Sequence, residues 1–219
     1  QGTSIKPNDY FVPFVINPRK SPEERTYFKD DTIQILCIGK YEIRKHHLMM
    51  MEVVKNLADR YKIHLTLIGE ATTAFQKGYH QEVLDYRKEQ GIEDLVTVKT
   101  NVPRSRMEEE YLRADLFVIP STREMASISQ IEAMSYSLPV ICSDSNGSAC
   151  YVEHGVTGYL FRDCDKEDLQ RQLEAMLCDR DKMKAMGAAG YRALLEKYNF
   201  DKYYDSVVQM AERIKSEKL

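Results

Sequence analysis

Two glutamates, Glu124 and Glu132, lie eight positions apart and flank the predicted start of a helix. Glu124 is in the loop after an apolar run, and Glu132 is on the helix itself. The backbone N–H groups of Ser127, Ile128 and Ser129 are expected between them, because the first N–H groups of a helix have no partner within it. These groups and the helix dipole form an anion site. Carboxylates accept hydrogen bonds from hydroxyls. The arrangement therefore predicts a ligand with phosphates and hydroxyls, such as a nucleotide sugar.

Small and basic residues follow three other apolar runs that are predicted to be strands. Gly39, Lys40 and Lys45 come after the first run, Gly69 ends the second, and Thr100 follows the third. Ligands of parallel α/β sheets bind at the carboxyl ends of the strands, so these residues are candidates for the same site. Neither GxGxxG nor GxxxxGK[ST] occurs in the chain, which excludes the usual dinucleotide and P-loop signatures.

Apolar runs and helical patterns alternate along the chain. Strands are predicted at 33–38, 63–68, 95–98, 116–119, 139–142 and 159–161, and helices at 75–90, 107–113, 127–136 and 179–198. This alternation predicts an α/β fold, a Rossmann-like doubly wound parallel sheet of about six strands with helices on both faces and further helices at the C-terminus.

Three segments are expected in the domain organisation. Residues 1–31 contain four prolines and form a predicted linker or peripheral segment. Residues 32–198 form the Rossmann-like nucleotide-sugar-binding domain, and 199–219 form a C-terminal crossover helix.

The stretch from Glu124 to Glu132 resembles the E-x7-E motif of retaining glycosyltransferases of the GT-B fold, family 4. The preceding strand with its LFVIPS sequence, the EAM that begins at Glu132, and the LPVI at 138–141 resemble the family's sequence around that motif. Residues 155–160 are similar to its G-x-x-G turn, and Gly39, Lys40 and Lys45 fall where the family has Gly-Arg and Lys.

The resemblance implies a role for each matching residue. Glu132 would accept hydrogen bonds from the nucleotide ribose, and Glu124 would contact hydroxyls of the transferred sugar. Lys40 and Lys45 would hold the diphosphate and stabilise the charge that grows on it as the anomeric bond breaks. Glu124 and Lys45 are thus the expected catalytic residues. The remaining donor-binding residues implied are Gly39, Ala126, Ser127, Ile128, Gly69 and Thr100.

Two departures in sequence and one larger gap separate this chain from the family pattern. Met125-Ala126-Ser127 stands where the family has Gly-Phe-Gly. Lys40 replaces an arginine, so an ammonium group takes the place of a guanidinium that can donate two parallel hydrogen bonds. The chain also has strands for one sheet only, whereas the family places its site between two domains. It therefore resembles the second, donor-nucleotide domain, and an N-terminal acceptor domain is its expected partner. Alone, the chain is expected to be inactive in transfer.

Composition limits the other partners and the location. There are 31 Lys and Arg against 34 Asp and Glu, a net charge of −3, which argues against a nucleic-acid binder. No apolar stretch is long enough to span a bilayer, and the five cysteines form no CxxC pair. A cytoplasmic protein is expected, with peripheral membrane contact through the missing domain. No metal or other cofactor is expected beyond the nucleotide-sugar substrate, for which UDP is the expected nucleotide.

Several alternatives remain open from the sequence. Glu132 could be a helix-surface glutamate, and Lys40, Lys45 and Arg44 could be solvated charges; that interpretation is preferred for Arg44. Ser127 is expected to cap the helix in either case. A nucleotide-sugar epimerase of GT-B fold and a non-catalytic nucleotide-binding or interaction module are the rival functions. The acceptor is expected to be a glycan or a lipid-linked sugar.

Overall fold

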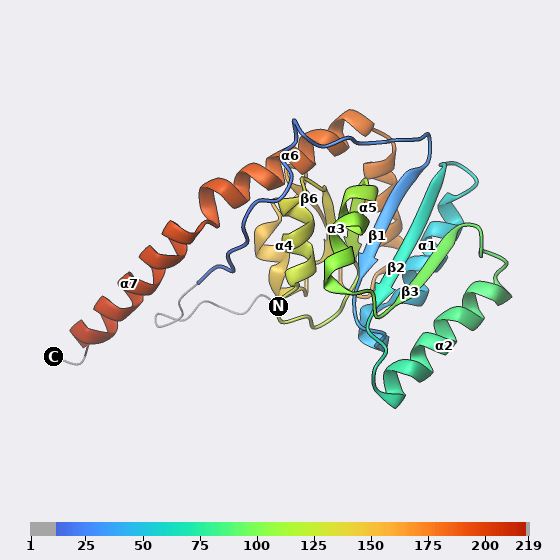
Figure 1. Cartoon of the computed structure of the whole chain (residues 1–219), viewed down its shortest axis with the longest axis horizontal. Coiled ribbons are helices and arrows are strands. Elements are labelled where there is room, and N and C mark those ends of the chain that lie inside the picture. The colour runs from blue at the N-terminus through green and yellow to red at the C-terminus, as the bar shows by residue number, and fades with distance from the viewer. Residues whose placement is uncertain (1–11, 218–219) are drawn as a thin grey trace.

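The computed structural model describes residues 12–217. Its six strands form one parallel sheet in the order β3–β2–β1–β4–β5–β6, which is the predicted doubly wound arrangement (Figure 1). The strands are β1 (Ile33–Ile38), β2 (Ile63–Gly69), β3 (Val96–Thr100), β4 (Leu116–Ile119), β5 (Val140–Ser143) and β6 (Gly158–Phe161).

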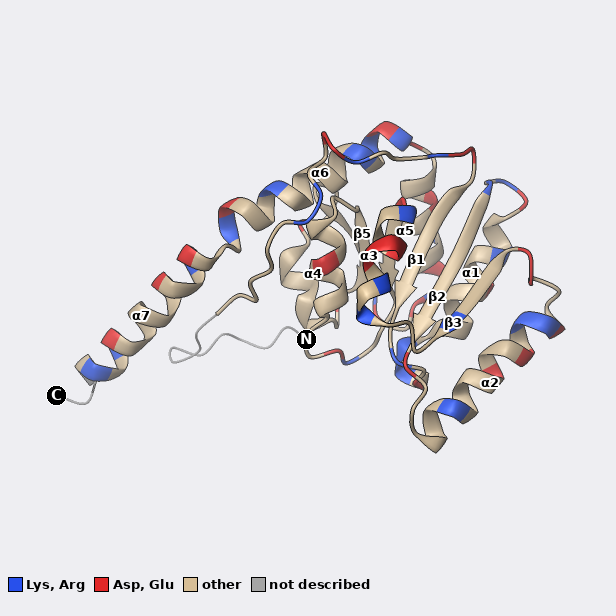
Figure 2. Cartoon of the chain, viewed as in Figure 1, with Lys and Arg blue, Asp and Glu red and all other residues tan. Residues whose placement is uncertain are grey.

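α-Helices connect consecutive strands from β1 to β5 and follow β6, whereas the connection from β5 to β6 contains only a 3-10 turn. They are α1 (His47–Leu57), α2 (Ala74–Glu89), α3 (Arg104–Arg113), α4 (Ile128–Ser135), α5 (Lys166–Leu177), α6 (Arg180–Lys197) and α7 (Phe200–Glu217), with short 3-10 turns at Ile43–Lys45 and Gly147–Tyr151. Figure 2 shows acidic and basic residues interspersed along these helices.

Helices cover both faces of the sheet, as predicted. Buried residues of α1, α2 and α5 pack in one hydrophobic cluster with β1 and β2, and those of α3 and α4 pack in a second cluster with β4 and β5. Every residue of β4 and β5 is buried. The apolar sequence of β4 and the first three residues of β5 therefore match a position between two layers of helices.

Two predicted boundaries move by two residues or more, both near the ligand edge of the sheet, and the other strand and helix ends given above differ by at most one residue. The third strand extends to Thr100 rather than ending at residue 98, because pairing with β2 continues to Gly69. Helix α3 begins at Arg104, three residues earlier than predicted, and Pro103 is its N-cap. Proline is tolerated there because its missing N–H would have no helical partner. The earlier start places Arg104 in the first turn.

Residues 12–31, the connector, contain no helix or strand, yet they are tied to the domain. The buried Arg25 donates to the carbonyl oxygens of Tyr136 (2.7 Å), Tyr111 (3.0 Å) and Ala114. Backbone N–H groups of Arg19 and Lys20 donate to the Ser135 carbonyl. The connector thus joins the ends of α3 and α4. The first eleven residues of the predicted linker lie outside the described residues.

Helix α7 extends away from the rest of the molecule (Figure 1). Its apolar side chains include Phe200, Tyr204 and Ile214, which are 65%, 59% and 41% exposed. Among the described residues, no helix combines the length and the apolar character that crossing a membrane requires.

Candidate functional site

The strand order reverses between β1 and β4, and the loops that follow these two strands diverge there. The loop after β1 carries Gly39, Lys40 and Lys45, and the loop after β4 carries Glu124. Such a switch point opens a crevice at the carboxyl edge of a sheet, which is where α/β proteins bind ligands. The predicted site residues of both loops therefore lie at the location that the fold favours.

An ion pair between Lys45 and Glu124 bridges the two loops. Both side chains are largely buried, at 9% and 13% exposure. Arg44 Nη1 also lies 2.8 Å from Glu124 Oε2, and its Nε lies 2.8 Å from Glu42. Partial burial opposes protonation of Arg44, but the hydrogen bond and charge of Glu124 raise its pKa overall. Arg44 is 40% exposed and thus partly solvated, and it also shares the Glu124 carboxylate with Lys45.

The loop that carries Glu124 is fixed from the far side by the turn after β5. Gly147 N–H donates to the Glu124 carbonyl (2.7 Å), and Ser127 N–H donates to Ser148 Oγ (2.6 Å). A Cβ atom on Gly147 would lie 2.7 Å from the Met125 carbonyl carbon and closer still to its oxygen. Only a residue without a side chain fits against this loop. The Met125 side chain points to solvent and is 92% exposed.

Helix α4 begins as predicted, with Ser127 as its N-cap, and the Ser127 hydroxyl accepts from Gln130 N–H (3.4 Å). One detail of the prediction is wrong, however. The N–H of Ser127 is bonded to Ser148 and is not available to a ligand. The amides of Ile128 and Ser129 belong to the first turn, where N–H groups have no helical partner. Ala126 lies in the loop just before the cap.

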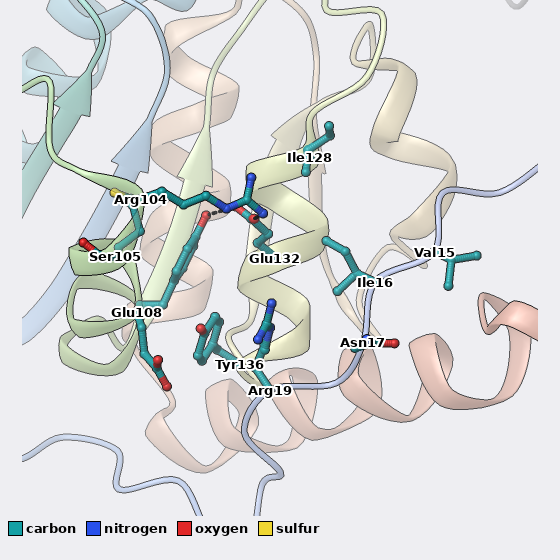
Figure 3. Close-up of a pocket in the computed structure, with 12 residues that line it drawn as sticks. Val15, Ile16, Asn17, Arg19, Arg104, Ser105, Glu108, Ile128, Glu132 and Tyr136 are labelled. Atoms are coloured by element: carbon teal, nitrogen blue, oxygen red, sulfur yellow. Dashed lines mark hydrogen bonds and ion pairs between the residues drawn. The ribbon is translucent and has the colours of Figure 1, made fainter.

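Glu132 lines a pocket of about 330 Å³ between α3, α4 and the connector (Figure 3). The buried Tyr111 of α3 donates its hydroxyl to Glu132 Oε2 (2.8 Å), and Arg104 lies 3.8 Å from Oε1. Figure 3 shows Arg104 reaching across the top of the pocket toward Glu132. Ile128 also lines this pocket, whereas Glu124 and Lys45 do not, so this pocket does not bring the two glutamates together as the sequence predicted. The wall opposite α3 is formed by connector residues 15–17 and 19.

A second pocket, of about 370 Å³, lies at the ends of β1 and β2 and is lined by Gly39, Lys40 and Gly69. Met107 lines both pockets, so they adjoin across the first turns of α3. A Cβ on Gly69 would lie 2.7 Å from the Tyr41 ring and closer still to the Gly39 carbonyl oxygen. Gly69 is thus required for loop packing.

The remaining predicted residues are placed as follows. Lys40 Nζ lies 3.3 Å from Glu70 Oε2, and both side chains are about half exposed. Thr100 is exposed at the end of β3, where it pairs with Gly69, and it lines neither pocket. No group of three or more His, Cys, Asp or Glu side chains among residues 12–217 is arranged to hold a metal ion.

Sequence reasoning missed Tyr111, Arg104 and the connector as parts of the site. Tyr111 lies 21 positions before Glu132, on a different helix, so no local motif joins them. The connector was predicted to be peripheral because its prolines exclude regular structure. Irregular backbone is nevertheless able to line a pocket, as residues 15–17 do here.

The strand order and the site at its reversal define a Rossmann-like α/β domain with a ligand site at the switch point. The family model described as "Glycosyl transferases group 1" matches residues 19–193, which is most of the chain. The chain therefore belongs to the group 1 glycosyltransferase family, as the E-x7-E resemblance predicted.

Two curated relatives illustrate the similarity. D-inositol 3-phosphate glycosyltransferase of Nocardia farcinica is 33% identical over 129 residues, covering 53% of this chain and 29% of the relative. Lipopolysaccharide 1,2-N-acetylglucosaminetransferase of Salmonella typhimurium is 28% identical over 187 residues, covering 82% of this chain and 48% of the relative. The chain thus spans less than half the length of these relatives.

Solved structures share the fold. Anabaena HepE in complex with UDP and glucose has a TM-score of 0.70 at 18% identity, covering 85% of this chain and 49% of that one. The C-terminal domain of the group 1 glycosyltransferase LpcC from Francisella tularensis has a TM-score of 0.69 at 18% identity, covering 77% of this chain and 87% of that one.

Proposed function

We propose that this chain is the donor-binding half of a retaining glycosyltransferase, and that its donor is a UDP-linked sugar. The observation that carries this proposal is the Lys45–Glu124 pair, which joins the two loops at the switch point just before the start of α4. The pair thus places the Lys45 ammonium and the Glu124 carboxylate on neighbouring loops, close to the first N–H groups of α4. A diphosphate next to a sugar needs these partners.

In the proposed binding mode each part of the donor has its own contact. Lys45 and Lys40 contact the diphosphate, with the amides of Ile128 and Ser129. The Glu124 carboxylate accepts hydrogen bonds from hydroxyls of the sugar, and Glu132 accepts them from the ribose. Gly39 and Gly69 let the backbone approach the nucleotide. Ala126 and Ser127 shape the loop that contacts the phosphates. Thr100 lies near the nucleobase of the donor.

The chemistry follows from the charge that develops during transfer. When the anomeric C–O bond breaks, negative charge grows on the departing nucleoside diphosphate. Lys45 is held in place by Glu124 at low exposure, so it is oriented before the reaction and its interaction strengthens as the charge grows. We propose that these protein groups suffice for this step without a metal ion.

The comparisons support a sugar transfer of this kind. The relatives are named D-inositol 3-phosphate glycosyltransferase and lipopolysaccharide 1,2-N-acetylglucosaminetransferase, and HepE structures were solved with UDP and with UDP-glucose. These names and ligands belong to the other proteins. They favour UDP as the nucleotide for this chain and a glycan or lipid-linked acceptor.

The acceptor half is proposed to be an N-terminal domain of the same full-length protein. The chain covers under half of its curated relatives, and the exposed apolar side chains of α7 offer a surface for that domain. We expect the chain alone to bind nucleotide and to transfer sugar poorly. The whole protein is proposed to act in the cytoplasm, with peripheral membrane contact through the missing half.

Calorimetric titration of the chain with UDP, GDP and ADP tests the proposal. UDP is expected to bind best, and Glu132→Ala is expected to weaken its binding by about 1–3 kcal/mol, the cost of losing a charged hydrogen-bond acceptor. Glu82→Ala, at an exposed position of α2, is the matched control and should leave affinity unchanged. Absence of heat with all three nucleotides would contradict the proposal. Conversion of the donor to an epimer without acceptor would favour an epimerase.

A further inference from the structure

We propose that Tyr111 is a positioning residue for nucleotide recognition. Its hydroxyl holds the Glu132 carboxylate in an orientation in which this group accepts hydrogen bonds from the ribose hydroxyls. This inference rests on the proposed function, in which Glu132 contacts the ribose, and adds a residue from a different helix. Tyr111 is part of neither the E-x7-E motif nor the loops at the strand ends.

The hydrogen bond between Tyr111 and Glu132 joins α3 to α4 at the floor of the pocket. Its length is 2.8 Å, and the same hydroxyl lies 3.4 Å from the Ser129 carbonyl oxygen, in the first turn of α4. The Glu132 side chain is 31% exposed. It is therefore open to the pocket while one of its oxygens is anchored.

The Tyr111 ring is itself held rigidly. It is 2% exposed and stacks on the Tyr136 ring with centroids 5.0 Å apart and planes 10° from parallel. The Tyr111 carbonyl accepts from the buried Arg25 of the connector. Burial raises the pKa of Tyr111, and the charge of Glu132 raises it further, so the phenol keeps its proton and remains a donor.

The two carboxylate oxygens of Glu132 therefore differ. Oε2 is bound to a buried, immobile donor, whereas Oε1 faces Arg104, which is 3.8 Å away and 91% exposed. A glutamate on a helix surface ordinarily samples several rotamers, and fixing one of them costs entropy on binding. The hydrogen bond from Tyr111 restricts the Glu132 side chain before a ligand binds, which lowers that cost and leaves Oε1 to accept from a hydroxyl.

The test compares UDP with 2′,3′-dideoxy-UDP by calorimetry on the full chain. Tyr111→Phe keeps the ring and deletes only the hydroxyl. It is expected to weaken UDP binding about fivefold to tenfold and to leave binding of the dideoxy analogue unchanged within twofold. In a Tyr111→Phe/Glu132→Gln double variant, UDP affinity should match that of Glu132→Gln alone. Tyr159→Phe, at a buried tyrosine of the edge strand β6, is the control for loss of a hydroxyl.

The outcomes separate this inference from the proposed function. Equal loss of affinity for both ligands in Tyr111→Phe would overturn the inference, because the hydroxyl would then act on the fold in general. If Glu132→Gln weakens UDP binding and Tyr111→Phe does not, the proposed function survives and the role of Tyr111 is refuted. A wild-type chain that does not bind UDP overturns both.

Discussion

Gly147 is the position where one methyl group should disturb the donor site most selectively. A Cβ there would lie 2.7 Å from the Met125 carbonyl carbon and 3.2 Å from the Glu124 carbonyl oxygen. Carbon atoms in ordinary contact are about 3.5–4.0 Å apart. The Met125 carbonyl oxygen would be closer still to this Cβ, so Gly147→Ala requires the 124–125 backbone to move by more than about 1 Å, away from the turn that holds it.

We expect this movement to weaken donor binding more than it lowers the free energy of unfolding. Met125 is 92% exposed, so little apolar area is lost when its loop shifts. The hydrogen bond from Gly147 N–H to the Glu124 carbonyl is 2.7 Å long, and losing it costs about 0.5–1.5 kcal/mol of unfolding free energy. The same shift moves the Glu124 carboxylate away from Lys45. Because the loss of a hydrogen bond to a charged group costs about 1.5–3 kcal/mol, and about 1.4 kcal/mol corresponds to tenfold in affinity, we expect UDP-sugar affinity to fall at least about tenfold.

Calorimetry with a UDP-sugar and urea denaturation measure the two effects on the same samples. Gly78→Ala is the matched control, since a Cβ at that position of α2 meets no atom within 4 Å. It should raise the unfolding free energy by about 0.5–1 kcal/mol and leave binding unchanged. If Gly147→Ala binds the donor as tightly as the wild type, the position of the 124–125 loop does not control binding and the assigned role of Glu124 is refuted.

Two further predictions concern the fold around the site. Arg25→Met removes the donor to three buried carbonyl groups, and it should lower the unfolding free energy by about 2–5 kcal/mol in urea titrations; a loss below about 1 kcal/mol would mean that the connector is not anchored there. Burial lowers the pKa of His47 to about 4, against about 6.5 in an unfolded chain. Between these pH values only the unfolded state gains the proton, so stability should fall by up to about 3 kcal/mol as the pH drops from 6.5 to 4. His47→Leu should flatten that part of the curve, and an unchanged slope would contradict the assignment.

The sequence by itself determined the elements and much of the ligand edge. The apolar runs at 116–119 and 139–142 indicated strands buried between layers, and Ser127 could be identified as a helix cap from its type and position. The spacing of Glu124 and Glu132, with the flanking residues, was sufficient for the family. These signals are local, because each depends on residues within about one helix or strand.

Only the tertiary structure decided which side chains share a partner. Arg44 and Glu124 are 80 positions apart, and Tyr111 and Glu132 belong to different helices. Their contacts exist because β1 pairs with β4, which brings the loops after these strands to one point, and because α3 and α4 pack on the same face. The fit of Gly147 under the Met125 carbonyl likewise depends on β5 lying beside β4. Contacts of this kind follow from strand order, and no pattern of neighbouring residues encodes them.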